Sequence, residues 1–176
     1  MAFFKDELKK IKAFIFDVDG VLSMDTTPLN VEGDPMRTAN VKDGFAIRSA
    51  LRNGMEVAII TGGFISRVKM RYEKLGVKYY YENINDKTEC LNDFTDKTKI
   101  DPAEILYMGD DLVDYLVMKK VGVPTCPADA APDIKGISKY ISDKKGGEGC
   151  VRDVIEQVLR AQDKWMDSEV FFNRSF

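Results

Sequence analysis

Lys12-Ala-Phe-Ile-Phe-Asp17-Val-Asp19-Gly20-Val-Leu-Ser23 is the stretch that decides the fold. Residues 13–16 form a continuous apolar run of strand length, which is typical of a parallel strand covered on both faces. Asp17 and Asp19 end the run, and ligands of open α/β sheets usually bind at the carboxyl ends of strands. Gly20 allows the backbone to approach a ligand closely. Taken alone, Asp-x-Asp-Gly is equally typical of an ordinary turn or a calcium loop.

The composition indicates one soluble domain. The chain has 176 residues, of which 44% are hydrophobic and 31% are charged. We therefore predict a single domain over residues 1–166, followed by a tail at 167–176. A net charge of −3 and the lack of a Lys/Arg-rich block argue against nucleic-acid binding.

Two further observations limit the compartment. No apolar run approaches the roughly 20 residues of a membrane span. Lys5, Asp6 and Glu7 precede the first apolar run, so a signal peptide is not expected and the predicted location is the cytoplasm.

Cysteine and histidine usage excludes several kinds of site. Cys90, Cys126 and Cys150 are scattered and odd in number, without a Cys-x-x-Cys pair, which favours reduced structural thiols. The chain has no histidine, so serine triads and His-bearing zinc sites are excluded.

Predicted strands and helices alternate along the chain. Strands are expected at 13–16, 56–60, 77–81, 105–108, 123–126 and 139–142. Helices are expected at 43–53, 65–75, 86–97, 112–121 and from 150 to about 165. Alternation of this kind predicts a three-layer, Rossmann-like α/β fold, with a mainly parallel sheet and helices on both faces.

Residues 24–40 contain Pro28, Gly33 and Pro35 and are predicted to form a small projecting flap or hairpin. The intervals from Asp19 to Thr61 and from Thr61 to Lys87 leave no room for a cap domain of roughly 50 residues or more.

Polar clusters follow the predicted strands. They are Asp17 with Asp19, Thr61-Gly62, Asp86-Lys87 and Asp110-Asp111. Each cluster alone is typical of a turn or a helix cap. Because the carboxyl ends of parallel strands share one edge of a sheet, all four can converge on one site.

The residue types in these clusters favour phosphoryl transfer. A carboxylate can attack a phosphate ester when a cation neutralises the charge on the phosphoryl oxygens. Asp17 and Asp110 offer the hard oxygen ligands that Mg²⁺ prefers, and Lys87 adds a fixed positive charge. Thr61 and the Gly62 amide are expected to hydrogen-bond the phosphoryl oxygens.

Asp19 is the candidate acid and base. It lies two residues after Asp17, hence on the same side of an extended chain. From there it could protonate the leaving alkoxide, and then deprotonate the water that attacks an aspartyl phosphate.

The four clusters, in this order and spacing, resemble the signature motifs of the haloacid-dehalogenase-like (HAD) phosphatases. The resemblance implies a HAD-like fold, with Asp17 as nucleophile and Asp19 as acid and base. It also implies Mg²⁺ bound by Asp17, by the backbone carbonyl of Asp19 and by Asp110.

A narrower resemblance is to the 3-deoxy-D-manno-octulosonate 8-phosphate (KDO 8-phosphate) phosphatases. It is carried by residues 40–48, 58–62, Arg71 with Leu75-Gly76, 127–130, 146–153 and 159–162. It implies hydrolysis of KDO 8-phosphate to KDO and inorganic phosphate, a step of lipopolysaccharide biosynthesis. The implied substrate contacts are Asp19, Asn40, Val41, Lys42, Asp43, Gly44, Arg48, Gly62, Arg71 and Lys87.

Gly63 departs from this family's pattern. Many members carry Arg after the Thr-Gly pair, and relatives that act on the nine-carbon 2-keto-3-deoxynononate 9-phosphate tend to carry Glu. The nine-carbon substrate, or a broader range of sugar phosphates, therefore stays open. Arg48 and Arg71 are also compatible with solvated helix charge.

The resemblance further implies a homotetramer in which the flaps pack together and each site is closed by a neighbour. The tail after Trp165, with Phe171, Phe172 and Phe176, is compatible with a frayed end or with a segment that reaches an adjacent site. Alternatives of other classes are a receiver-type phosphoacceptor module and a non-catalytic oligomerisation subunit.

Overall fold

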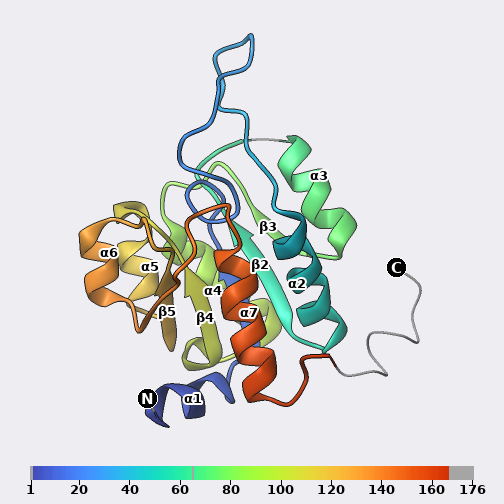
Figure 1. Cartoon of the computed structure of the whole chain (residues 1–176), viewed down its shortest axis with the longest axis vertical. Helices are drawn as coiled ribbons and strands as arrows, with labels where there is room; N and C mark the ends of the chain where they lie inside the picture. Colours follow the sequence, from blue (N-terminus) through green and yellow to red (C-terminus); the bar gives the residue numbers. More distant parts are fainter. Residues whose placement is uncertain (1, 65, 167–176) are drawn as a thin grey trace.

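A computed structural model describes residues 2–64 and 66–166. Its centre is one six-stranded sheet in the order β3-β2-β1-β4-β5-β6, in which every pairing is parallel (Figure 1). The strands are β1 (Ala13–Phe16), β2 (Glu56–Ile60), β3 (Tyr79–Tyr81), β4 (Ile105–Met108), β5 (Val123–Cys126) and β6 (Tyr140–Ile141). The predicted α/β fold with a parallel sheet is confirmed.

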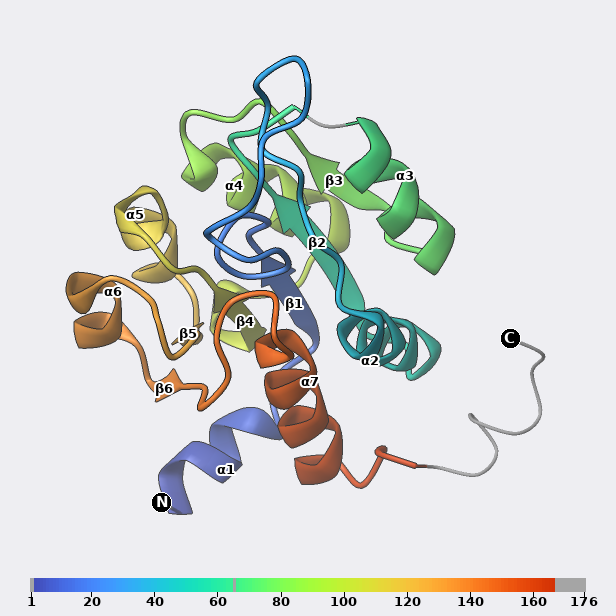
Figure 2. The same cartoon turned by 45° about the horizontal axis from the view of Figure 1, so that its top comes forward.

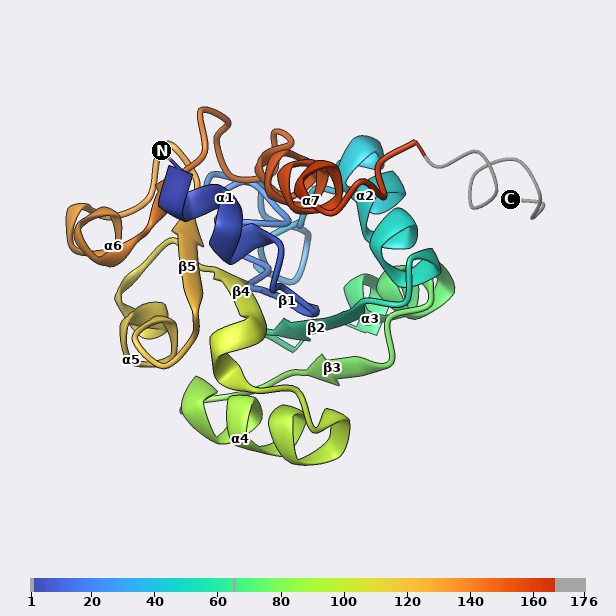
Figure 3. The same ribbon diagram turned by 90° about the horizontal axis from the view of Figure 1, so that it is seen from below.

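Helices cover both faces of the sheet (Figure 3). They are α1 (Ala2–Leu8), α2 (Val41–Arg52), α3 (Ser66–Leu75), α4 (Lys87–Thr98), α5 (Tyr115–Met118), α6 (Pro132–Ile137) and α7 (Cys150–Ala161). Two short 3₁₀ segments, η1 (Pro102–Glu104) and η2 (Leu112–Asp114), join them. None of the helices in the described part of the chain combines the length and the apolar composition of a membrane span.

Alternation along the strands divides the core into two layers. Phe14 and Phe16 of β1 pack with α1, α2, α3 and α7 on one face. Ala13 and Ile15 of the same strand pack with α4, α5 and α6 on the other. β1 lies between these two cores, and all four of its residues have no exposed surface, as the continuous apolar run predicts.

The register places the strand ends at one level. Phe16, the last residue of β1, pairs with Ile59 of β2 and with Met108 of β4. The residues that follow these strands therefore meet at one edge of the sheet, as expected for parallel strands.

Residues 24–40 rise from this edge as a projecting loop that an isolated antiparallel bridge between Leu29 and Pro35 closes (Figure 2). The loop that leads into α7 returns to the same edge, where the Gly147 amide donates to the Val21 carbonyl at 2.8 Å. The predicted boundary at residue 166 stays a prediction, and the tail at 167–176 lies outside the described residues.

Several elements differ from the sequence-based prediction. The predicted helix 112–121 is shorter and divided into η2 and α5. α2 begins at Val41 instead of residue 43, because Asn40 caps it by accepting hydrogen bonds from the Lys42 and Asp43 amides. α7 ends at Ala161, before the predicted residue 165. α1, α6 and η1 were not predicted, since they are short and lack a clear helical period.

Candidate active site

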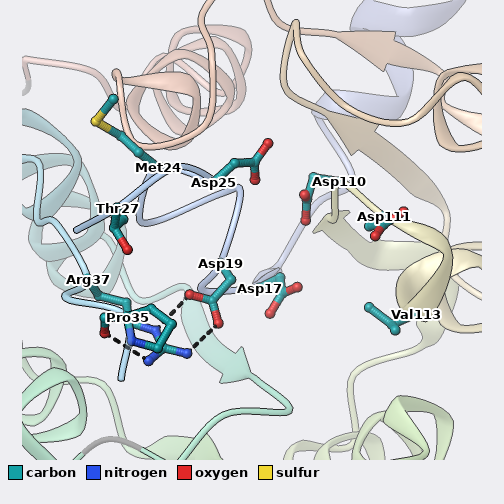
Figure 4. A pocket seen from close by; sticks show the side chains of 10 residues that line it. All are labelled: Asp17, Asp19, Met24, Asp25, Thr27, Pro35, Arg37, Asp110, Asp111 and Val113. Carbon is teal, nitrogen blue, oxygen red and sulfur yellow. Dashed lines mark hydrogen bonds and ion pairs between the residues drawn. The ribbon is translucent and has the colours of Figure 1, made fainter. Parts of the chain in front are cut away.

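A cavity of about 290 Å³ opens at the carboxyl edge of the sheet (Figure 4). It is lined by residues of the loop after β1, of the projecting loop and of the loop after β4. They are Asp17, Asp19, Met24, Asp25, Thr27, Pro35, Arg37, Asp110, Asp111 and Val113. Three predicted site residues, Asp17, Asp19 and Asp110, thus line one cavity.

Asp17 is held by a buried cation. Its Oδ2 lies 2.7 Å from Nζ of Lys87, and its Oδ1 accepts the Val18 amide at 2.6 Å. Lys87 is the first residue of α4, directly after the cap residue Asp86. The start of this helix therefore fixes the ammonium group beneath the nucleophile candidate.

Asp114 completes this buried group and was missed by sequence reasoning. Its Oδ1 accepts from Lys87 Nζ at 2.7 Å and from the Tyr107 hydroxyl at 2.6 Å, and its Oδ2 accepts the Asp110 amide at 3.2 Å. The available signal was an Asp four residues after Asp110, at the junction of η2 and α5. Asp114 thus positions both Lys87 and Asp110.

The carboxylates of Asp17, Asp110 and Asp114 form a candidate metal centre, since one oxygen of each lies within 4.8 Å of the others. Burial, with repulsion from Asp114, raises the pKa of Asp17 to about 7 against the opposing effect of Lys87. Burial, with repulsion from Asp17, raises the pKa of Asp110 to about 8.

A divalent cation would relieve this repulsion, and hard oxygen donors are those that Mg²⁺ prefers, so the residues fit Mg²⁺. Both oxygens of Asp114 already accept hydrogen bonds. Asp17 and Asp110 line the cavity whereas Asp114 does not, so these two are the candidate ligands, and their binding of Mg²⁺ stays a prediction. The predicted contribution of the Asp19 carbonyl stays a prediction.

Gly20 makes the approach of Asp110 possible. Its φ of +74° favours glycine, and a Cβ there would overlap the carboxylate of Asp110. The glycine of the Asp-x-Asp-Gly sequence is therefore required by the close approach of Asp110.

Asp19 faces the projecting loop. Arg37 donates from Nε to Asp19 Oδ1 at 2.8 Å and from Nη2 to Asp19 Oδ2 at 3.0 Å (Figure 4). This bidentate ion pair fixes the plane of the candidate acid and base. Nothing in the sequence pattern pointed to Arg37.

Thr61 and Gly62 follow β2 at the same edge. Thr61 is buried and its Oγ1 accepts the Gly63 amide at 3.1 Å, whereas Gly62 is exposed. Neither residue lines the cavity, so their predicted contact with a phosphoryl group stays a prediction.

The other predicted substrate contacts gather around the start of α2, away from the cavity lining. Asn40 donates from Nδ2 to the Gly147 carbonyl at 3.1 Å, and buried Asp43 accepts the Arg152 amide at 2.7 Å. Gly44 lies against Arg71, whose Nη2 is 3.1 Å from the position of a Cβ at residue 44. Val41 and Lys42 are exposed and Arg48 is half-buried.

No family model matches the chain. Among curated proteins, the 3-deoxy-D-manno-octulosonate 8-phosphate phosphatase KdsC of Salmonella typhi is 39% identical over 89% of this chain and 83% of its own. The enzyme of the same name from Yersinia pestis is 36% identical over 88% of this chain and 82% of its own.

Solved structures agree with these relatives. The crystal structure of the Yersinia pestis phosphatase superposes with a TM-score of 0.89 at 34% identity, over 93% of this chain and 88% of that one. The phosphatase from Moraxella catarrhalis, in complex with magnesium ion, phosphate ion and KDO, superposes with a TM-score of 0.90 at 32% identity, over 99% of both chains. The chain described here therefore belongs to the 3-deoxy-D-manno-octulosonate 8-phosphate phosphatase family of the HAD superfamily.

Proposed function

We propose that this protein is a Mg²⁺-dependent phosphatase that hydrolyses KDO 8-phosphate to KDO and inorganic phosphate. The observation that carries the proposal is the buried contact of Asp17 with Lys87, at the wall of a cavity shared with Asp19 and Asp110. The substrate class comes from relatives that align over most of the chain and are named as KDO 8-phosphate phosphatases.

Asp17 is the proposed nucleophile. One of its carboxylate oxygens attacks phosphorus, and the bond from phosphorus to the sugar oxygen breaks. Lys87 holds the Asp17 carboxylate in place from below. Mg²⁺, when held by Asp17 and Asp110, supplies the positive charge that offsets the charge of the phosphoryl oxygens.

Asp19 is the proposed acid and base. Its carboxyl proton passes to the leaving sugar oxygen, and the resulting carboxylate then accepts a proton from water. That water oxygen attacks phosphorus, the bond from Asp17 to phosphorus breaks, and inorganic phosphate leaves. Asp19 is suited to both transfers because 48% of its side chain is exposed, whereas Asp17 is buried.

The test is Asp17→Asn, assayed for phosphate release from KDO 8-phosphate. We expect turnover to be abolished while the circular dichroism spectrum stays native, because an amide oxygen is a poor nucleophile. Asp101→Asn, at an exposed carboxylate outside the site, is the matched control and should retain full activity. Substantial residual turnover in Asp17→Asn would refute the nucleophile assignment.

Gly63 motivates a second candidate substrate, the nine-carbon 2-keto-3-deoxynononate 9-phosphate. Comparing kcat/KM for the eight- and nine-carbon substrates decides between them. Equal values for both, and for simple hexose phosphates, would indicate a broader sugar phosphatase. A receiver-type module would instead retain its phosphate and show no steady-state release.

We also propose that the chain assembles as a homotetramer in the cytoplasm. Exposed apolar side chains on the projecting loop support an assembly through that loop, since Leu29, Val31 and Met36 are 64%, 97% and 48% exposed. Light scattering should give the mass of four chains, and Val31→Asp should lower it. In the tetramer, Asn40 to Gly44, Arg48 and Arg71 are expected to contact substrate.

A further inference from the structure

Arg37 is a cation on the cavity wall to which the proposed reaction assigns no contact with substrate. Its side chain comes from the projecting loop and is only 11% exposed (Figure 4). Besides its two bonds to Asp19, it donates from Nη1 to the Pro35 carbonyl at 3.1 Å. A guanidinium has five N–H groups, so these three bonds leave two for a molecule in the cavity.

The charges around the cavity make this cation important for binding. Five of the described lining residues are carboxylates and Arg37 is the one cation among them. Lys87 lies deeper, beneath Asp17, and is only 4% exposed. An anionic substrate that enters the cavity therefore meets repulsion from the wall, except at Arg37 and at any bound cation.

Gly63 leaves the space that Arg37 occupies. A Cβ at residue 63 would lie 3.1 Å from Nη2 of Arg37 and 3.7 Å from Oδ2 of Asp19. The first distance is closer than ordinary van der Waals contact, so a side chain at residue 63 would require the guanidinium to shift by a few tenths of an ångström. The small residue after β2 and the arginine of the projecting loop are thus complementary.

We propose that Arg37 binds an anionic oxygen group of the substrate, phosphoryl or carboxylate, through its two remaining N–H groups while it holds Asp19 with the others. The inference rests on the proposed function, because it takes the substrate to be a sugar-acid phosphate. Arg37 is then a specificity-determining residue that couples substrate binding to the position of the acid and base.

The test compares Arg37→Gln and Arg37→Lys with Arg160→Gln. Arg160 is a matched control because it makes a similar two-donor contact with Glu156, at 2.9 and 2.7 Å, outside the cavity. For KDO 8-phosphate we expect KM to rise about tenfold or more in Arg37→Gln, since charge-assisted hydrogen bonds are lost. The KM of Arg37→Lys should lie between those of the wild type and Arg37→Gln, because lysine keeps the positive charge but lacks the planar guanidinium. Arg160→Gln should match the wild type.

Two further measurements separate the possible anions. A hexose 6-phosphate carries a phosphoryl group but no carboxylate, and calorimetric titration with inorganic phosphate or with KDO measures the binding of each group without turnover. Raised KM for both substrates with weaker phosphate binding identifies the phosphoryl group. Raised KM for the sugar acid alone with weaker KDO binding identifies the carboxylate.

Unchanged KM and unchanged affinities in Arg37→Gln would overturn the inference, even if kcat fell, because Arg37 would then act only through Asp19. Absence of phosphate release by the wild-type protein would instead contradict the proposed function. The titrations still decide the role of Arg37 in that case, so the two failures are distinguishable.

Discussion

The Lys87 ammonium lies 2.7 Å from the Asp17 carboxylate, and only 4% and 7% of the two side chains are exposed. Lys87→Met would leave Asp17 and Asp114 buried without their cation. Removing one partner of a buried pair costs about 3 to 5 kcal/mol, so we expect a loss of this size in the free energy of unfolding at pH 7. Urea denaturation measures it.

The control for this prediction is Lys97→Met, which removes an exposed pair with Asp93 at 2.6 Å. Exposed ion pairs on helices contribute little to stability, so this variant should stay close to the wild type. Equal losses in both variants would show that Lys87 is not structurally coupled to the buried carboxylates.

Gly20→Ala should damage the site more than the fold. A Cβ at residue 20 would overlap the Asp110 carboxylate, so we expect kcat to fall at least about tenfold, the cost of a barrier higher by about 1.4 kcal/mol. Gly33→Ala is the matched control, because its φ is also positive, at +88°, but nothing lies within 4 Å of the new methyl group. It should lose about 1 to 2 kcal/mol of stability, the cost of an L residue in the left-handed region, and retain its kcat. Equal kcat values in the two variants would contradict the crowding argument.

Mg²⁺ should stabilise the folded chain through Asp17 and Asp110. A ligand present at 100 times its Kd adds about 2.7 kcal/mol to the free energy of unfolding, which raises Tm. We expect Asp110→Asn to abolish this rise and Asp111→Asn, whose side chain accepts the Leu112 amide, to keep it. Thermal scans with Mg²⁺ and with a chelator measure the difference. Persistence of the full rise in Asp110→Asn would exclude Asp110 as a ligand.

Asp43 should make stability depend on pH. Burial raises its pKa to about 6, even though the Arg152 amide opposes the shift. The folded chain then binds this proton more tightly than the unfolded chain. The stabilisation that the proton gives the folded chain is therefore fully present below about pH 4 and is lost as pH rises through about 6.

The loss amounts to about 3 kcal/mol, at about 1.4 kcal/mol for each pKa unit. Asp43→Asn cannot titrate, so its stability relative to the wild type should increase from pH 4 to pH 7. Parallel pH profiles of unfolding free energy for the two proteins would contradict the assignment.

The sequence alone indicated the sheet and the main carboxylates because both depend on short local patterns. The continuous apolar run before Asp17, and a second one before Gly109, are confirmed as β1 and β4. Their pairing in register brings Asp17 and Asp110 together. This part of the site is therefore a direct consequence of parallel strands that end at the same level.

Asp114 and Arg37 could not be predicted in the same way. The periodicity of residues 112–121 favours one helix, and it does not reveal the 3₁₀ turn that buries Asp114 beneath Lys87. Arg37 lies in a loop without periodicity, and only the folded chain brings it to Asp19, eighteen positions away along the sequence. Asn40 was singled out by the sequence, but the sequence does not distinguish a helix cap, which Asn40 is in the structure, from a substrate contact.

The position of β1 between β2 and β4 also bears on how the protein is made. The ribosome releases Asp17, the proposed nucleophile, early, whereas Lys87 and Asp110, the proposed second magnesium ligand, emerge only with α4 and the loop after β4. A nascent chain that stops before Glu56 would carry Asp17 on an unpaired strand, and one that stops before Lys87 would lack both the ammonium group and Asp110. Products truncated before these residues should consequently be inert towards phosphate esters, and phosphatase activity should indicate that synthesis has passed the loop after β4.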